Sequence, residues 1–144
     1  MKLYPNHYCE NITTLTPEFL KENNIKALIL DVDNTLLDFN LKIVDGLKQW
    51  HDKIRENGIK CIILSNSNKL TKVKMVADLL DIPFIKFAMK NLKRGFKMAQ
   101  KQLDIPFENI AAVGDQIFTD VIGANGVKMF SILVKPLDKK DLWM

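Results

Sequence analysis

Five short, apolar, β-prone runs alternate along this chain with longer stretches whose apolar residues recur at helical spacing. The predicted strands cover residues 26–31, 60–65, 83–87, 110–115 and 128–134. Strands that are separated by single helices need crossover connections, which are right-handed and place helices on both faces of one sheet. The pattern therefore predicts an α/β fold, with a parallel five-stranded sheet flanked by helices.

The connecting stretches predict helices over residues 42–56, 70–80 and 92–103, the first of which ends at Asn57-Gly58. An N-terminal arm, residues 1–25, contains a short predicted helix that Thr16 caps and Pro17 begins. A chain of 144 residues without a linker or repeat is expected to form one domain, residues 1–144.

Composition narrows the class of protein. Apolar residues make up 47% and charged residues 26%, and no apolar run approaches the ~20 residues that a membrane span needs, so we expect a cytoplasmic protein. The net charge is +4, but the basic residues are spread along the chain, which argues against a nucleic-acid partner. The two cysteines have no metal-ligand spacing, and Cys61 opens an apolar run that predicts a buried thiol.

Polar residues lie at the ends of three of the predicted strands. Asp31 and Asp33 lie at the end of the first strand, Ser65 and Asn66 at the end of the second, and Asp115 at the end of the fourth. Ligands of parallel α/β sheets bind outside the carboxyl ends of the strands. We therefore expect these residues to converge at one edge of the sheet.

The acids at this edge suit a divalent cation. Residues i and i+2 of an extended backbone point to the same side, so Asp31 and Asp33 can face one cleft. Asp115 and Asp120 would add two more carboxylates, and such a set of hard oxygen ligands suits Mg²⁺. The alternative for each acid alone is that it caps a local turn.

Anion-binding groups are also expected near these acids. The Ser65 hydroxyl and the backbone N–H of Asn66 could bind phosphate oxygens, although Ser and Asn also form turns for structural reasons. Lys90 and Lys93 fall between the third strand and the third helix, where a cation could offset the acids. The alternative is that both are surface lysines.

Three segments in this order resemble motifs of the haloacid dehalogenase (HAD) superfamily. "DVDNTLL" resembles the first motif, DxDx[TV], "ILSNS" the second and "VGDQIFTD" the fourth. "LYPNHYCENITTLTPEFLKENNIKALILDVDNTL" and "GDQIFTDVIGANGVKMFSILVKPL" further resemble the IIIA subclass known as the YqeG family, which is related to phosphatidylglycerophosphatases. The third motif departs from the family's Lys-Pro pair, because Lys90 is followed by Asn91.

The resemblance implies a capless, Mg²⁺-dependent phosphatase. Asp31 would attack phosphorus and carry an aspartyl-phosphate, and Asp33 would act as general acid and then as general base. Mg²⁺ would lie between the Asp31 carboxylate, the backbone carbonyl of Asp33 and Asp115, with Asp120 close by.

The remaining motif residues would serve the phosphate group. Ser65, the Asn66 backbone and Lys90 would hold the transferring oxygens, while Thr35 would brace the loop after the first strand. Lys93 is the second candidate for the motif lysine.

The spacing also bears on the substrate. The intervals between the motif residues are about 25 to 35 residues, which one helix and one strand fill, so no cap domain fits between them. An uncapped cleft suits a phosphate on a large or membrane-bound molecule, or a site that another subunit closes. The family relation implies phosphatidylglycerol phosphate, hydrolysed from the inner membrane surface. The residues expected near lipid, or alternatively packed on the domain, are Leu3, Tyr4, Tyr8, Leu142 and Trp143.

Other classes of protein fit less well. A receiver domain would need a phospho-accepting aspartate at the end of the third strand, where this chain has "KFAMK". The nucleotide-binding motifs GxxxxGK and GxGxxG are absent from the sequence. A catalytically idle HAD-like binding module is the remaining alternative.

Overall fold

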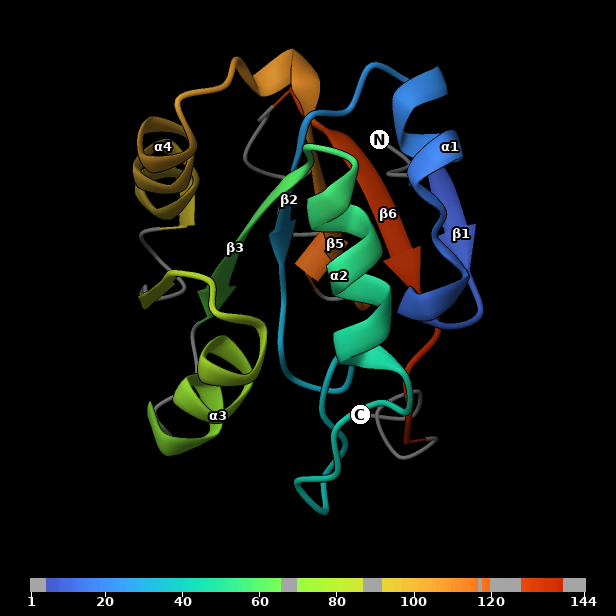
Figure 1. The fold of residues 1–144 in the computed structure, drawn as a ribbon. Helices are drawn as coiled ribbons and strands as arrows, with labels where there is room; N and C mark the ends of the chain where they lie inside the picture. The colour runs from blue at the N-terminus through green and yellow to red at the C-terminus, as the bar shows by residue number, and fades with distance from the viewer. Residues whose placement is uncertain (1–4, 66–69, 87–91, 117, 120–127, 139–144) are drawn as a thin grey trace.

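The structure is a computed structural model that describes residues 5–65, 70–86, 92–116, 118–119 and 128–138. Its centre is a parallel sheet in the order β1-β6-β5-β2-β3-β4 (Figure 1). The strands are β1 (His7–Cys9), β2 (Ala27–Leu30), β3 (Lys60–Ser65), β4 (Phe84–Lys86), β5 (Ile110–Gly114) and β6 (Phe130–Val134). The helices are α1 (Pro17–Glu22), α2 (Leu47–Glu56), α3 (Leu70–Leu80) and α4 (Leu92–Leu103), with 3₁₀ turns η1 (Ile12–Thr14) and η3 (Phe107–Asn109).

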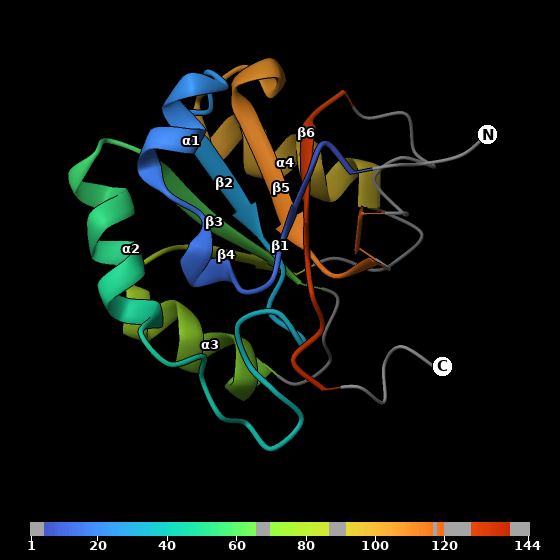
Figure 2. The ribbon, with the colours of Figure 1, turned by 90° about the vertical axis from the view of Figure 1, so that its right-hand side faces the viewer.

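Helices cover both faces of the sheet, which confirms the predicted α/β class. Side chains of β2 alternate between the faces, so that Leu28 and Leu30 pack with α1, α2 and α3 while Ile29 packs with α4. Figure 2 shows α2 and α3 on one side of the sheet and α4 on the other. Phe96 of α4 is completely buried and lies in the core between α4 and the sheet.

The sheet has a strand that the sequence did not predict. β1 lies within the predicted N-terminal arm and pairs in parallel with β6, with His7 opposite Ile132 and Cys9 opposite Val134. Three residues are too few to show an alternating pattern, and the strand forms because the edge of β6 offers unpaired backbone groups. The prediction of five strands was therefore wrong by one.

The start of α2 was also predicted wrongly. The sequence predicted residue 42, but the helix begins at Leu47. Leu41 and Gly46 have φ of 62° and 78°, in the left-handed region that a right-handed helix excludes. The Asp38 carboxylate accepts a hydrogen bond from the Lys42 backbone N–H at 2.9 Å and closes a turn instead. Local side-chain hydrogen bonding therefore outweighs helical periodicity in this loop.

Two predictions about single residues, the Thr16 cap and the buried Cys61 thiol, are confirmed. The Thr16 hydroxyl accepts a hydrogen bond from the Phe19 backbone N–H at 3.1 Å, so Thr16 caps α1, and Pro17 is its first residue. Cys61 is buried in β3, and burial raises the pKa of its thiol to about 12. This thiol therefore stays protonated and acts as a core residue.

None of the helices in the described ranges is long and apolar enough to cross a membrane.

His51 gives the fold a pH dependence that can be measured. Burial lowers the pKa of His51 on α2, the charges of Arg55 and Lys48 lower it further, and Asp52 opposes them. The unfolded chain then binds a proton that the native protein does not, so stability falls as the pH drops below about 6.5, by about 1.4 kcal/mol per pKa unit of separation. We expect the free energy of unfolding, measured in urea, to fall more between pH 7 and pH 5 for wild type than for His51→Gln. Equal losses would contradict the assignment.

Candidate active site

The strand register brings three predicted site residues to one edge of the sheet. Leu30 at the end of β2 lies opposite Ile63 of β3 and Val113 of β5. Asp31, Ser65 and Asp115 follow these residues by one or two positions, so they end adjacent parallel strands at the same edge. The expected convergence of these three positions is present in the fold.

Asp31 lies in a sheltered, acid-rich environment. Its side chain is buried, with 8% of its surface exposed, and its carboxylate accepts hydrogen bonds from the backbone N–H groups of Val32 and Asp115. The fully buried Thr35 hydroxyl lies 3.5 Å from Oδ2 of Asp31. Burial raises the pKa of Asp31 well above its ordinary range, and the charges of Asp115 and Asp33 raise it further.

Asp115 is held by the turn that follows β5. Its Oδ1 atom accepts a hydrogen bond from the Phe118 backbone N–H at 3.0 Å, and its carbonyl accepts one from the Thr119 N–H at 3.0 Å. Asp115 therefore caps a turn and faces Asp31 at the same time. Gly114 makes this turn possible, because a Cβ atom there would lie 2.5–2.8 Å from side-chain atoms of Phe118.

The loop after β2 is held by Asn34, a residue that was not among the predicted site residues. Asn34 has a φ of 58°, a conformation that asparagine tolerates better than most residues. Its side-chain oxygen accepts a hydrogen bond from the Asp138 backbone N–H at 2.8 Å, and the Asp138 carboxylate accepts one from the Phe39 N–H at 2.8 Å. The segment after β6 thus holds the loop that carries Asp33.

The described lysine that contacts the acids is not one of those predicted from the sequence. The Lys72 ammonium, from the first turn of α3, forms an ion pair with Oδ1 of Asp33. Lys93 at the start of α4 is exposed. The predicted residues Asn66, Lys90 and Asp120 lie outside the described residues. A lysine two residues inside a helix belongs to no motif, so no pattern in the sequence identifies Lys72 as a site residue.

The donors at this edge suit Mg²⁺ by their chemistry. Burying Asp31 next to the charges of Asp33 and Asp115 is unfavourable without a nearby cation, and carboxylate and carbonyl oxygens are the ligands that Mg²⁺ prefers. Within the described ranges, no three acidic, histidine or cysteine side chains already form a metal-binding group. The predicted magnesium ligands are the carboxylates of Asp31 and Asp115 and the backbone carbonyl of Asp33. Asp120 is the fourth predicted member of the set.

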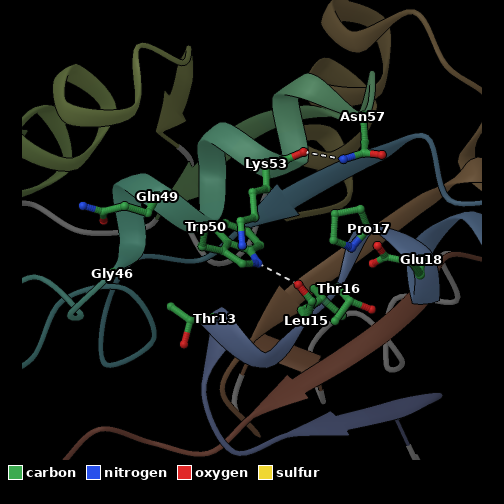
Figure 3. Close-up of a pocket in the computed structure, with 10 residues that line it drawn as sticks. All are labelled: Thr13, Leu15, Thr16, Pro17, Glu18, Gly46, Gln49, Trp50, Lys53 and Asn57. Atoms are coloured by element: carbon green, nitrogen blue, oxygen red, sulfur yellow. Dashed lines mark hydrogen bonds between the residues drawn. The ribbon is translucent and has the colours of Figure 1, made fainter.

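Two cavities in the described part of the protein lie away from these acids. One, of about 380 Å³, lies between α1 and α2, where the Trp50 indole N–H donates to the Leu15 carbonyl at 2.7 Å (Figure 3). The other, of similar volume, is lined by residues that include His51 and Cys61. None of the predicted site residues lines either cavity, so neither belongs to the candidate site.

Comparison with known proteins agrees with this geometry. Residues 39–128, more than half of the chain, match the model of the haloacid dehalogenase-like hydrolases. The chain is 38% identical over 138 residues to the "Probable phosphatase YqeG" of Bacillus subtilis (strain 168), covering 95% of this chain and 80% of that protein.

Two solved structures share the fold of this chain. A putative HAD family hydrolase from Streptomyces avermitilis MA-4680 has a TM-score of 0.61 at 21% identity, covering 83% of this chain and 74% of that one. The 3-deoxy-D-manno-octulosonate 8-phosphate phosphatase of Moraxella catarrhalis, solved with magnesium, phosphate and KDO, has a TM-score of 0.50 at 22% identity, covering 70% and 64%. The chain therefore belongs to the haloacid dehalogenase-like hydrolases, and it is a phosphatase of that superfamily.

Proposed function

We propose that this protein is a Mg²⁺-dependent phosphomonoester hydrolase that works through an aspartyl-phosphate on Asp31. The observation that carries the proposal is the position of the Asp31 carboxylate, which is buried at the strand-end edge and faces the charges of Asp115 and Asp33. A carboxylate in this environment is costly for the fold, and such perturbed acids are typical of catalytic sites.

The reaction proceeds in two steps. A carboxylate oxygen of Asp31 bonds to phosphorus while the ester P–O bond breaks, and Asp33 gives its proton to the departing alkoxide. Asp33 then takes a proton from water as that water attacks phosphorus, which releases phosphate and restores the Asp31 carboxylate. Thr35 and the Val32 N–H, both in contact with Asp31, hold the nucleophile in place.

The proposed metal ligands are the Asp31 carboxylate, the Asp33 backbone carbonyl, Asp115 and Asp120. Bound there, Mg²⁺ would offset the charge between the nucleophile and the phosphate oxygens. Support comes from the oxygen donors and from the Moraxella catarrhalis phosphatase of similar fold, whose structure holds magnesium. Ser65, the Asn66 backbone and Lys90 are the proposed partners of the transferring oxygens, with Lys93 as the alternative lysine.

For the substrate we propose a phosphate carried on a large molecule, phosphatidylglycerol phosphate being the first choice. The short intervals between the motifs, which leave no room for a cap domain, support an open site. Tyr8, which is half-exposed on the edge strand β1, is a proposed lipid contact. The protein would then act from the cytoplasm at the inner membrane surface.

The test is phosphate release by the purified protein with Mg²⁺ and with EDTA, on p-nitrophenyl phosphate and on phosphatidylglycerol phosphate micelles. Mg²⁺-dependent release is expected from both, with the higher kcat/KM on the lipid. Release from p-nitrophenyl phosphate alone would refute the lipid substrate and keep the phosphatase. Binding of phosphate esters without release from any of them would favour the idle binding module.

A further inference from the structure

The ion pair between Lys72 and Asp33 joins two elements of the candidate site. Asp33 belongs to the loop after β2, and Lys72 belongs to α3, the helix that follows β3. The Lys72 side chain is 17% exposed and that of Asp33 is 36% exposed. The pair is therefore partly withdrawn from water. A partly buried ion pair is screened less than one on the open surface.

The oxygen that Lys72 contacts has no other described partner. Oδ1 of Asp33 is itself shielded from solvent, and within the described ranges no hydrogen-bond donor other than the Lys72 ammonium reaches it. A buried carboxylate oxygen without a donor is costly, so the ammonium of Lys72 provides the compensation. Removing that ammonium would leave the Asp33 carboxylate without the contact that fixes its orientation.

The position of Lys72 in its helix also argues for a role outside the helix. Lys72 is the third residue of α3, and a cation in the first helical turn is unfavourable beside the positive end of the macrodipole. Lys74, two residues further along the helix, is exposed. A lysine at position 72 does not stabilise the helix. It does stabilise the loop that carries Asp33, through the ion pair.

We propose that Lys72 is a positioning residue: it holds the Asp33 carboxyl group through Oδ1, so that Oδ2 carries the proton toward the leaving group. The inference rests on the proposed function, in which Asp33 is the general acid. Lys72 makes no covalent change and loses no proton in this role. It sets the direction of the Asp33 carboxylate before the P–O bond breaks, and substrate binding itself does not depend on it.

Two aryl phosphates of nearly the same shape separate this role from a structural one. Nitrophenolate leaves without help from an acid, whereas phenolate leaves more readily when it is protonated. Lys72→Met is expected to lower kcat/KM on phenyl phosphate by about tenfold or more, while the value on p-nitrophenyl phosphate changes by no more than about twofold. Lys72→Arg should restore most of the loss, and Lys74→Met, the exposed control, should match wild type on both substrates.

A double-mutant cycle tests whether Lys72 acts through Asp33. In the Asp33→Asn background, Lys72→Met is expected to cause no further loss on phenyl phosphate, because the group that it positions is gone. A further loss equal to that seen in wild type would overturn the inference. So would an equal loss on both substrates, or a raised KM with unchanged kcat, which would make Lys72 a substrate-binding residue.

The outcomes also separate this inference from the proposed function. If wild type releases phosphate from neither aryl ester nor from phosphatidylglycerol phosphate micelles, the proposed function fails and the inference fails with it. If wild type is active and Asp31-dependent but Lys72→Met equals Lys74→Met on phenyl phosphate, only the role of Lys72 is refuted. Thermal melting of Lys72→Met beside Lys74→Met verifies that the compared proteins are folded.

Discussion

Replacing Asp31 with asparagine is expected to abolish phosphate release while it makes the metal-free protein more stable. An amide cannot form the acyl-phosphate, so kcat should fall on the order of 10⁴-fold or more. Asparagine still offers an oxygen to the Val32 and Asp115 N–H groups, and it removes a buried charge that faces two others. In EDTA the variant should therefore gain about 1 kcal/mol in free energy of unfolding at neutral pH.

The sign of the pH dependence follows from the raised pKa of Asp31. The native protein holds the carboxyl proton more tightly than the unfolded chain, so this residue lowers stability as the pH rises through its native pKa. The gain in free energy of unfolding caused by Asp31→Asn should accordingly be larger at pH 8 than at pH 5. Urea unfolding in EDTA measures it, and Asp78→Asn, an exposed acid on α3, is the matched control. Full turnover by Asp31→Asn would refute the nucleophile assignment.

A single methyl group at Gly114 is expected to damage both the fold and the site. The added Cβ would lie 2.8 Å from Phe118 Cβ, so the turn itself must move and a ring rotation cannot relieve the contact. Overpacking of this kind costs about 1–3 kcal/mol. The same turn holds Asp115 through the Phe118 N–H, so Mg²⁺-dependent phosphate release should fall at least about tenfold, as displaced catalytic groups usually cause.

Gly58 provides the control for this experiment. Its φ is 77°, so Gly58→Ala should cost about 1–2 kcal/mol through backbone strain, but nothing lies within 4 Å of the added methyl group. It follows Asn57, the C-cap of α2, and is not a predicted site residue. The two variants should thus lose comparable stability in urea while only Gly114→Ala loses activity and Mg²⁺ affinity. Wild-type activity in Gly114→Ala would show that the turn does not position Asp115.

Most of the sheet could be predicted from apolar runs. β3 was predicted from Lys60 to Ser65, as found, and β2 and β5 within one residue at each end, because buried parallel strands read as continuous apolar segments. β1 could not be predicted, since its three residues become a strand only by pairing with β6. The start of α2 failed because Asp38 and two left-handed residues interrupt a stretch with helical periodicity.

The sequence by itself determined which residues end the buried strands, and with them Asp31, Ser65 and Asp115 as the edge of the site. That information is local, because a strand's apolar run and the polar residue after it are neighbours in the chain. Only the tertiary structure decided that Lys72 meets Asp33 and that Asn34 binds Asp138, 104 positions away. These contacts join segments whose distance and orientation depend on how α3 and β6 pack, and no local pattern of residue types encodes that packing.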